Sequence, residues 1–133
     1  KEDCVMWAPD DGVLFVGDIF GWGLIPSGGL LDSELRKLIG NTYQRLIDFD
    51  ANLVVPGHGP VCRTGELVRW VEYFDWLLDT VGQLVAAGKN DREIITTLTP
   101  PTDMHDWWRF EAWKHEDALS KVLTSARRGV LGA

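Results

Sequence analysis

The segment GVLFVGDIF, residues 12–20, places one acidic side chain between two apolar runs. Residues 13–16 predict a buried strand, and Gly17 ends it directly before Asp18. A carboxylate in such a place is costly to bury, because desolvation disfavours its charged form unless a partner neutralises it. Backbone N–H groups of a turn are one such partner, and a metal cation is another.

The elements around this segment follow from apolar spacing. Residues 4–9 and 13–16 predict a β-hairpin around an Asp-Gly turn. A short strand is expected over 53–55, stopped by Pro56. Apolar positions at helical spacing predict four helices, over residues 33–48, 64–87, 91–98 and 108–127. Few strands beside many helices indicate an α/β fold, in which a small β-sheet is covered by helices on one face.

Composition limits the classes of partner. A chain of 133 residues with 45% hydrophobic content is expected to form a single domain over residues 1–133. Thirteen Lys and Arg against twenty Asp and Glu give a formal charge of −7. This balance argues against nucleic acid and against an anionic membrane surface, since both attract basic proteins. No apolar run reaches membrane-spanning length.

Two features concern the cellular setting. Cys4 and Cys62 are far apart in the sequence, and we expect two buried thiols in a reducing cytoplasm rather than a disulfide. The N-terminal residues KEDCVMWAPDDG include no signal-peptide h-region and no initiator Met. They are typical of a strand that begins before the first residue. We therefore expect either that a tag was removed or that the chain is the later part of a longer protein.

A second loop with chemical interest is PGHGP, residues 56–60, directly after the strand 53–55. The carboxyl ends of neighbouring strands can bring Asp18 and His58 to one point at the sheet edge. Aspartate and histidine both ligate zinc, iron or manganese. The glycines on either side of His58 allow the sharp bend that presents an imidazole outward. The alternatives are that Asp18 caps a turn and that His58 is a turn residue.

These two motifs carry a resemblance to a known family. GVLFVGDIF, followed by LVVPGHGPV at residues 53–61, resembles the C-terminal half of a metallo-β-lactamase-fold protein. The hairpin, the long helix after the second motif, the segment AAGKNDREI at 86–94 and the final amphipathic helix are similar as well. The resemblance covers nearly the whole chain. It implies half of an αββα sandwich.

The resemblance also implies a site and an activity. Asp18 would bridge two metal ions and orient a metal-bound hydroxide, which makes it the expected catalytic residue. His58 would complete the second metal site as a neutral imidazole. The cofactor would be a divalent metal, zinc, with iron as the alternative. The parent protein would be a hydrolase that attacks an ester, thioester, lactam or phosphoester of a small-molecule substrate.

The chain also departs from the family pattern. The signature His-x-His-x-Asp-His is absent, and so is the histidine that normally precedes the hairpin. His105 and His115 match no ligand motif, and we expect surface or packing roles for them. One Asp and one His are too few ligands for a tight site. We therefore expect a fragment with weak or absent metal binding and no turnover, whose partner is the missing N-terminal half.

The loop 20–29 follows the expected metal ligand directly. Its aromatic residues Phe20 and Trp22 are candidate substrate-binding residues, and its glycines would let it move. A hydrophobic plug over the helix 33–48 is an equal alternative.

Two other functions stay open. The segment GDIFGWG has some similarity to relatives that hold two irons and reduce oxygen or nitric oxide with a flavin domain. The chain could instead be a non-catalytic interaction module, because an apolar half-interface left uncovered would favour a homo-oligomer.

Overall fold

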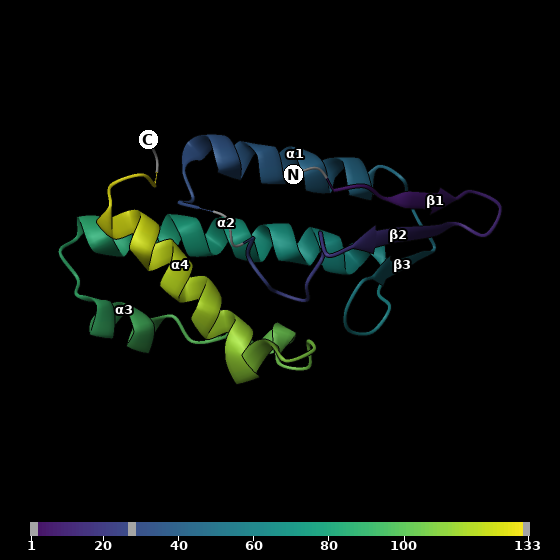
Figure 1. Ribbon diagram of the computed structural model, residues 1–133. Coiled ribbons are helices and arrows are strands. Elements are labelled where there is room, and N and C mark those ends of the chain that lie inside the picture. Colours follow the sequence, from purple (N-terminus) through teal and green to yellow (C-terminus); the bar gives the residue numbers. More distant parts are fainter. Residues whose placement is uncertain (1–2, 27–28, 132–133) are drawn as a thin grey trace.

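A computed structural model describes residues 3–26 and 29–131. Its strands and helices follow one another in the predicted order (Figure 1). They are β1 (Met6–Ala8), β2 (Val13–Gly17), α1 (Ser33–Ile47), β3 (Leu53–Pro56), α2 (Thr64–Ala86), α3 (Asp91–Thr97) and α4 (His115–Arg127). The prediction of an α/β fold is confirmed at this level. Within the described ranges, none of the helices combines the length and the apolar character needed to cross a membrane.

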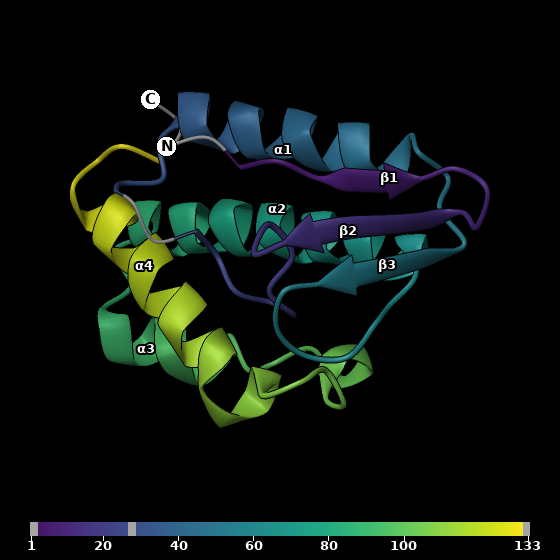
Figure 2. The same cartoon turned by 45° about the vertical axis from the view of Figure 1, so that its right-hand side comes forward.

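The three strands form one mixed sheet in the order β1-β2-β3. β1 pairs with β2 antiparallel, as expected for a hairpin, whereas β2 pairs with β3 in parallel. The arrows of β2 and β3 therefore point the same way in Figure 2, with α1 in the connection between them. Since parallel strands end at one edge, the residues that follow Gly17 and Pro56 are neighbours in space.

The inner face of the sheet belongs to the hydrophobic core. Leu14, Val16 and Val54 have no exposed surface and join one buried cluster with side chains from the helices. Trp70 of α2 stacks on Tyr43 of α1, with ring centroids 4.2 Å apart and 8° between the planes. These stacked rings fix α1 against α2, which lie side by side in both views (Figures 1 and 2).

The opposite face of the sheet is apolar and partly exposed among the described residues. Side chains alternate along a strand, and paired residues share a face, so Met6, Phe15 and Val55 lie together on this side. Met6 is 67% exposed and Phe15 is 41% exposed. We call this surface the outer sheet face; it comprises Met6, Ala8, Val13, Phe15, Leu53 and Val55.

The last predicted helix begins later than expected. The apolar spacing predicted a helix from residue 108, but α4 begins at His115. Arg109 has φ 57°, a left-handed conformation that an α-helix excludes. One turn of π-helix, η2 (Phe110–Lys114), follows it and leads into α4. A short 3₁₀ helix, η1 (Thr102–Met104), precedes this region.

The two cysteines are unpaired, as expected, but only one of them is buried. Cys62 forms an antiparallel bridge with Val54 beside β3. Burial raises the pKa of its thiol to about 12, and nearby Glu66 adds to the shift. The expectation of a buried Cys4 is wrong: this residue precedes the first strand and is exposed.

Candidate metal site

Asp18 and His58 come together at the shared edge of β2 and β3. Nε2 of His58 lies 3.6 Å from Oδ1 of Asp18. The side chain of Asp18 is 75% exposed, and that of His58 is 74% exposed. This distance between Nε2 and Oδ1 is too long for a hydrogen bond. An imidazole and a carboxylate nevertheless lie beside each other at one open point of the surface.

Gly57 sets the approach of the two loops. Its N–H donates to the carbonyl of Gly17 at 2.8 Å, which continues the pairing beyond the ends of the strands. A Cβ atom on Gly57 would lie 2.6 Å from Oδ1 of Asp18. The absence of a side chain at this position therefore leaves the Asp18 carboxylate room beside the loop of His58.

Two tryptophan rings hold the other side of the His58 loop. Gly59 has φ +83°, and a Cβ atom there would lie 2.7 Å from Cδ1 of Trp22 and 2.8 Å from Cε3 of Trp108. Nε1 of Trp22 also donates to the carbonyl of Pro60 at 3.0 Å. The sequence prediction did not include Trp108 in the site. No local sequence pattern indicates a role for Trp108, because this residue is distant from Gly59 in the sequence and only the tertiary fold brings the two together.

Phe20 and Trp22 point into the protein rather than toward the open edge. They are 1% and 7% exposed, and their ring centroids lie 5.8 Å and 5.4 Å from that of Trp107. Their burial is what the hydrophobic-plug alternative predicts. Substrate contact by these two residues stays a prediction, and we leave it out of the site built below.

The loop that begins after Asp18 is held at its backbone. The described residues 19–25 offer carbonyl groups to side chains from three helices and from the turn before α4. The donors are Tyr43 to Ile19 at 2.8 Å, Lys114 to Gly21 at 2.8 Å, Trp70 to Leu24 at 3.3 Å and Lys121 to Ile25 at 2.9 Å. Residues 27–28 of the predicted loop lie outside the described residues. These hydrogen bonds hold the segment that follows Asp18 in place.

The remaining histidines lie away from this edge. His115 is buried: its Nδ1 lies 2.9 Å from the hydroxyl of Tyr73, and its Nε2 lies 2.7 Å from the carbonyl of Leu98. A carbonyl only accepts hydrogen bonds, so Nε2 carries the proton and Nδ1 accepts from the tyrosine. His105 is exposed, with Nδ1 2.8 Å from the carbonyl of Thr102. These are the packing and surface positions that we expected.

Two side chains that could ligate a metal, those of Asp18 and His58, meet at the candidate site. In the part of the chain that the structure describes, no three His, Cys, Asp or Glu side chains come close enough together to hold a metal ion. Metal binding by Asp18 and His58 stays a prediction.

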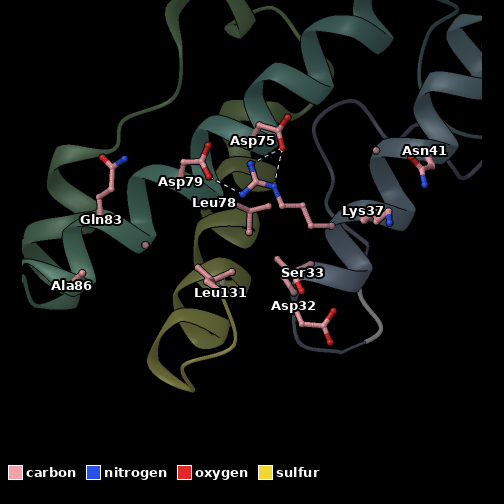
Figure 3. Close-up of a pocket in the computed structure, with 14 residues that line it drawn as sticks. Asp32, Ser33, Lys37, Asn41, Asp75, Leu78, Asp79, Gln83, Ala86 and Leu131 are labelled. Atoms are coloured by element: carbon pink, nitrogen blue, oxygen red, sulfur yellow. Dashed lines mark hydrogen bonds and ion pairs between the residues drawn. The ribbon is translucent and has the colours of Figure 1, made fainter. Parts of the chain in front are cut away.

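A groove with a volume of about 810 Å³ lies elsewhere, between α1 and α2 (Figure 3). Arg36 crosses it and donates to Asp75 at 2.8 Å and to Asp79 at 2.7 Å. The hydrogen bond from Arg36 lowers the pKa of Asp79. This guanidinium is neutralised by two carboxylates, while Lys37 and Asp32 also line the groove. We place the candidate site at the sheet edge, where the ligating side chains converge.

Comparison with models of known protein families gives no match, and no curated protein matches the sequence significantly. The resemblance to the metallo-β-lactamase fold therefore rests on the two motifs and stays a prediction.

Proposed function

We propose that this chain is the C-terminal part of a metal-dependent hydrolase of the metallo-β-lactamase superfamily, with Asp18 and His58 as metal ligands. The observation that carries the proposal is the 3.6 Å separation of Nε2 and Oδ1 at the ends of two parallel strands. Residues forty positions apart reach this distance only because β2 and β3 pair in parallel across α1.

The donor pair fits a divalent metal. Zinc binds histidine nitrogen and carboxylate oxygen at about 2.0–2.2 Å, so two ligand atoms in a tetrahedral sphere lie about 3.4 Å apart. The observed 3.6 Å is close to this value. A surface ion pair between Asp18 and a protonated His58 is the competing explanation. At this exposure an ion pair contributes little to the free energy of folding. It therefore does not account for the approach of the two loops.

The outer sheet face supports the idea of a missing half. It is made of apolar residues, and its strands β1 and β2 carry Met6 and Phe15 in contact with solvent. A sheet of a folded protein normally buries its apolar face against another layer. We propose that the N-terminal half of the fold covers this face and brings the further ligands to the metal.

A bound divalent metal would supply an activated hydroxide and would polarise a carbonyl or phosphoryl oxygen of a small-molecule substrate. Asp18 would hold it through Oδ1 and would orient a proton-bearing group with its second oxygen. His58 would donate the lone pair of Nε2, the atom that faces Asp18. The two unpaired cysteines agree with a cytoplasmic protein.

Zinc titration of the chain by calorimetry tests the two ligands. We expect weak binding, in which Asp18→Ala and His58→Ala each lower the affinity at least tenfold. Matched controls are Asp10→Ala, in the hairpin turn at the other end of β2, and His105→Ala, a second exposed histidine. Both should stay within twofold of the wild type. Equal affinity in all five proteins would remove the assignment.

The metal and the parent protein need a second experiment, on the longer gene product if the reading frame continues upstream. A His-x-His-x-Asp-His segment before Lys1, with zinc in the purified protein, would support the hydrolase. Iron together with flavin absorbance would favour the di-iron oxidoreductase instead. A reading frame that starts at Lys1 would argue against both enzymes.

A further inference from the structure

We propose that Lys114 is a positioning residue for the candidate metal site. Its ammonium group contacts both the segment that follows Asp18 and the tryptophan ring that packs against the loop of His58. The inference rests on the proposed function for the metal itself. The effect on the geometry of the two loops can be measured without a metal.

The surroundings of Lys114 are unusual for a lysine. The residue is 2% exposed, and Nζ donates to the carbonyl of Gly21 at 2.8 Å. Nζ also lies 4.3 Å from the ring centroid of Trp108 and 5.8 Å from that of Trp113. Among the described residues no carboxylate forms an ion pair with it. Its charge is therefore stabilised by one carbonyl dipole and by aromatic faces.

Each of these contacts leads to one ligand loop. Gly21 is three residues after Asp18 and belongs to the segment that supports it. The ring of Trp108 packs against Gly59, the residue after His58. If the ammonium is removed, the Gly21 carbonyl loses its donor. The Trp108 ring loses the nearer of two cations, since the Arg109 guanidinium remains 4.7 Å from its centroid. Both loops are then less constrained, and the distance between the ligand atoms is less well defined.

The local backbone explains why Lys114 reaches this place. It is the last residue of the π-helical turn η2, which follows the left-handed Arg109. A π turn shifts the following side chains around the helix axis relative to an α-helix, and such turns are frequent at functional sites. Without it, the side chain at position 114 would point in another direction.

Lys121 provides a matched control. It lies seven residues later, on the same side of the helix, and donates to the carbonyl of Ile25 at 2.9 Å. It holds the same loop farther from Asp18 and is paired with Asp117 at 2.7 Å. Within the described part of the chain, the cations over the Trp108 ring are those of Arg109 and Lys114, not that of Lys121. Removal of either ammonium takes away one lysine–carbonyl bond, but only the removal at 114 affects the ring beside Gly59.

The experiment compares Lys114→Met with Lys121→Met, since methionine keeps an unbranched apolar stem. We expect both variants to unfold at a lower urea concentration than the wild type. Only Lys114→Met should weaken zinc binding, at least tenfold. In the metal-free chain, only Lys114→Met should shift the backbone NMR resonances of residues 18 and 57–59.

Two results separate this inference from the proposed function. If the wild type binds zinc and Lys114→Met binds it within twofold, the inference is overturned and the proposed function stands. If the wild type binds no zinc, the proposed function fails. If, in addition, the resonances of residues 18 and 57–59 do not move in metal-free Lys114→Met, the inference is overturned as well. Should Lys114→Met not fold, Lys114→Gln is measured in the same way; it can still donate to Gly21 but carries no charge.

Discussion

The flanking residues of Asp18 suggested that its carboxylate is buried and needs a partner to neutralise its charge, but burial is not the reason for a partner in the structure. Apolar residues on both sides predicted a buried carboxylate, but the side chain is 75% exposed. The backbone turns after Gly17, so that Phe20 enters the core while Asp18 stays at the surface. Desolvation is therefore small here, and the case for a cation depends on the nearby imidazole of His58.

Gly57→Ala tests whether the place of the Asp18 carboxylate matters for the metal. The new Cβ would lie 2.6 Å from Oδ1 of Asp18, the end of a flexible side chain that can move away, and 3.2 Å from the backbone carbonyl carbon of Gly17, which must shift by a few tenths of an ångström. We expect the free energy of unfolding to fall by less than about 1 kcal/mol. Zinc affinity should fall at least fivefold, because the displaced carboxylate no longer faces His58.

The control for this variant is Gly65→Ala in α2, where a Cβ would meet no atom within 4 Å. It should leave zinc affinity unchanged and stabilise the helix by up to about 1 kcal/mol. Wild-type affinity in Gly57→Ala would show that Oδ1 is not a ligand.

The buried ammonium of Lys114 predicts a pH dependence of stability. Desolvation, with a smaller effect of the nearby Arg109 charge, lowers its pKa from 10.5 to about 8. Between these values the unfolded chain binds more protons than the folded chain, so folding becomes more favourable as the pH rises. The stability of the wild type relative to Lys114→Met should increase by roughly 1 to 3 kcal/mol from pH 7 to pH 10.

Urea unfolding of both proteins at several pH values measures this difference, since groups that titrate alike in the two chains cancel. A difference that is flat with pH, or that falls, would contradict the lowered pKa.

At the scale of the elements, periodicity and end signals predicted most boundaries. Asp32 accepts from the N–H of Leu35 at 2.8 Å and starts α1, and Gly88 with φ +79° follows the end of α2. Asn90 and Glu93 form a capping box at α3. Such local signals act over three or four residues, so the sequence alone identifies them.

The region before α4 shows the limit of this reasoning. Apolar spacing that included Phe110 and Trp113 predicted one helix from residue 108. In the structure, Trp107 and Phe110 are buried around a left-handed Arg109. Long-range packing decides the backbone here and overrides local preference. The same limit applies to the site: two strand ends predicted Asp18 and His58, whereas Trp108 and Lys114 reach the site through contacts that no spacing indicates.

At the scale of the whole molecule, the outer sheet face is an apolar surface on which Met6 and Phe15 are exposed. An apolar layer that contacts water favours association with another apolar surface. In the absence of the proposed N-terminal half, a second copy of the chain offers such a surface. Concentration-dependent self-association of the purified chain is therefore expected.

Met6→Lys tests this expectation, since Met6 is 67% exposed and its replacement should cost little stability. Sedimentation at several concentrations should show the wild type shifting toward dimers and Met6→Lys remaining monomeric. Ile95→Lys, at a 52% exposed apolar position on α3, is the control and should behave like the wild type. A wild type that is monomeric at every concentration would argue against an association surface on the sheet.

The parallel pairing of β2 with β3 has one more consequence. Both proposed ligands are present in any unfolded or nicked chain, yet they meet only after the α1 crossover has packed and the third strand has docked beside the second. Ion capture would then report on completed tertiary structure. Added zinc would raise the midpoint of thermal unfolding, because the ion would bind the folded chain and not the unfolded one.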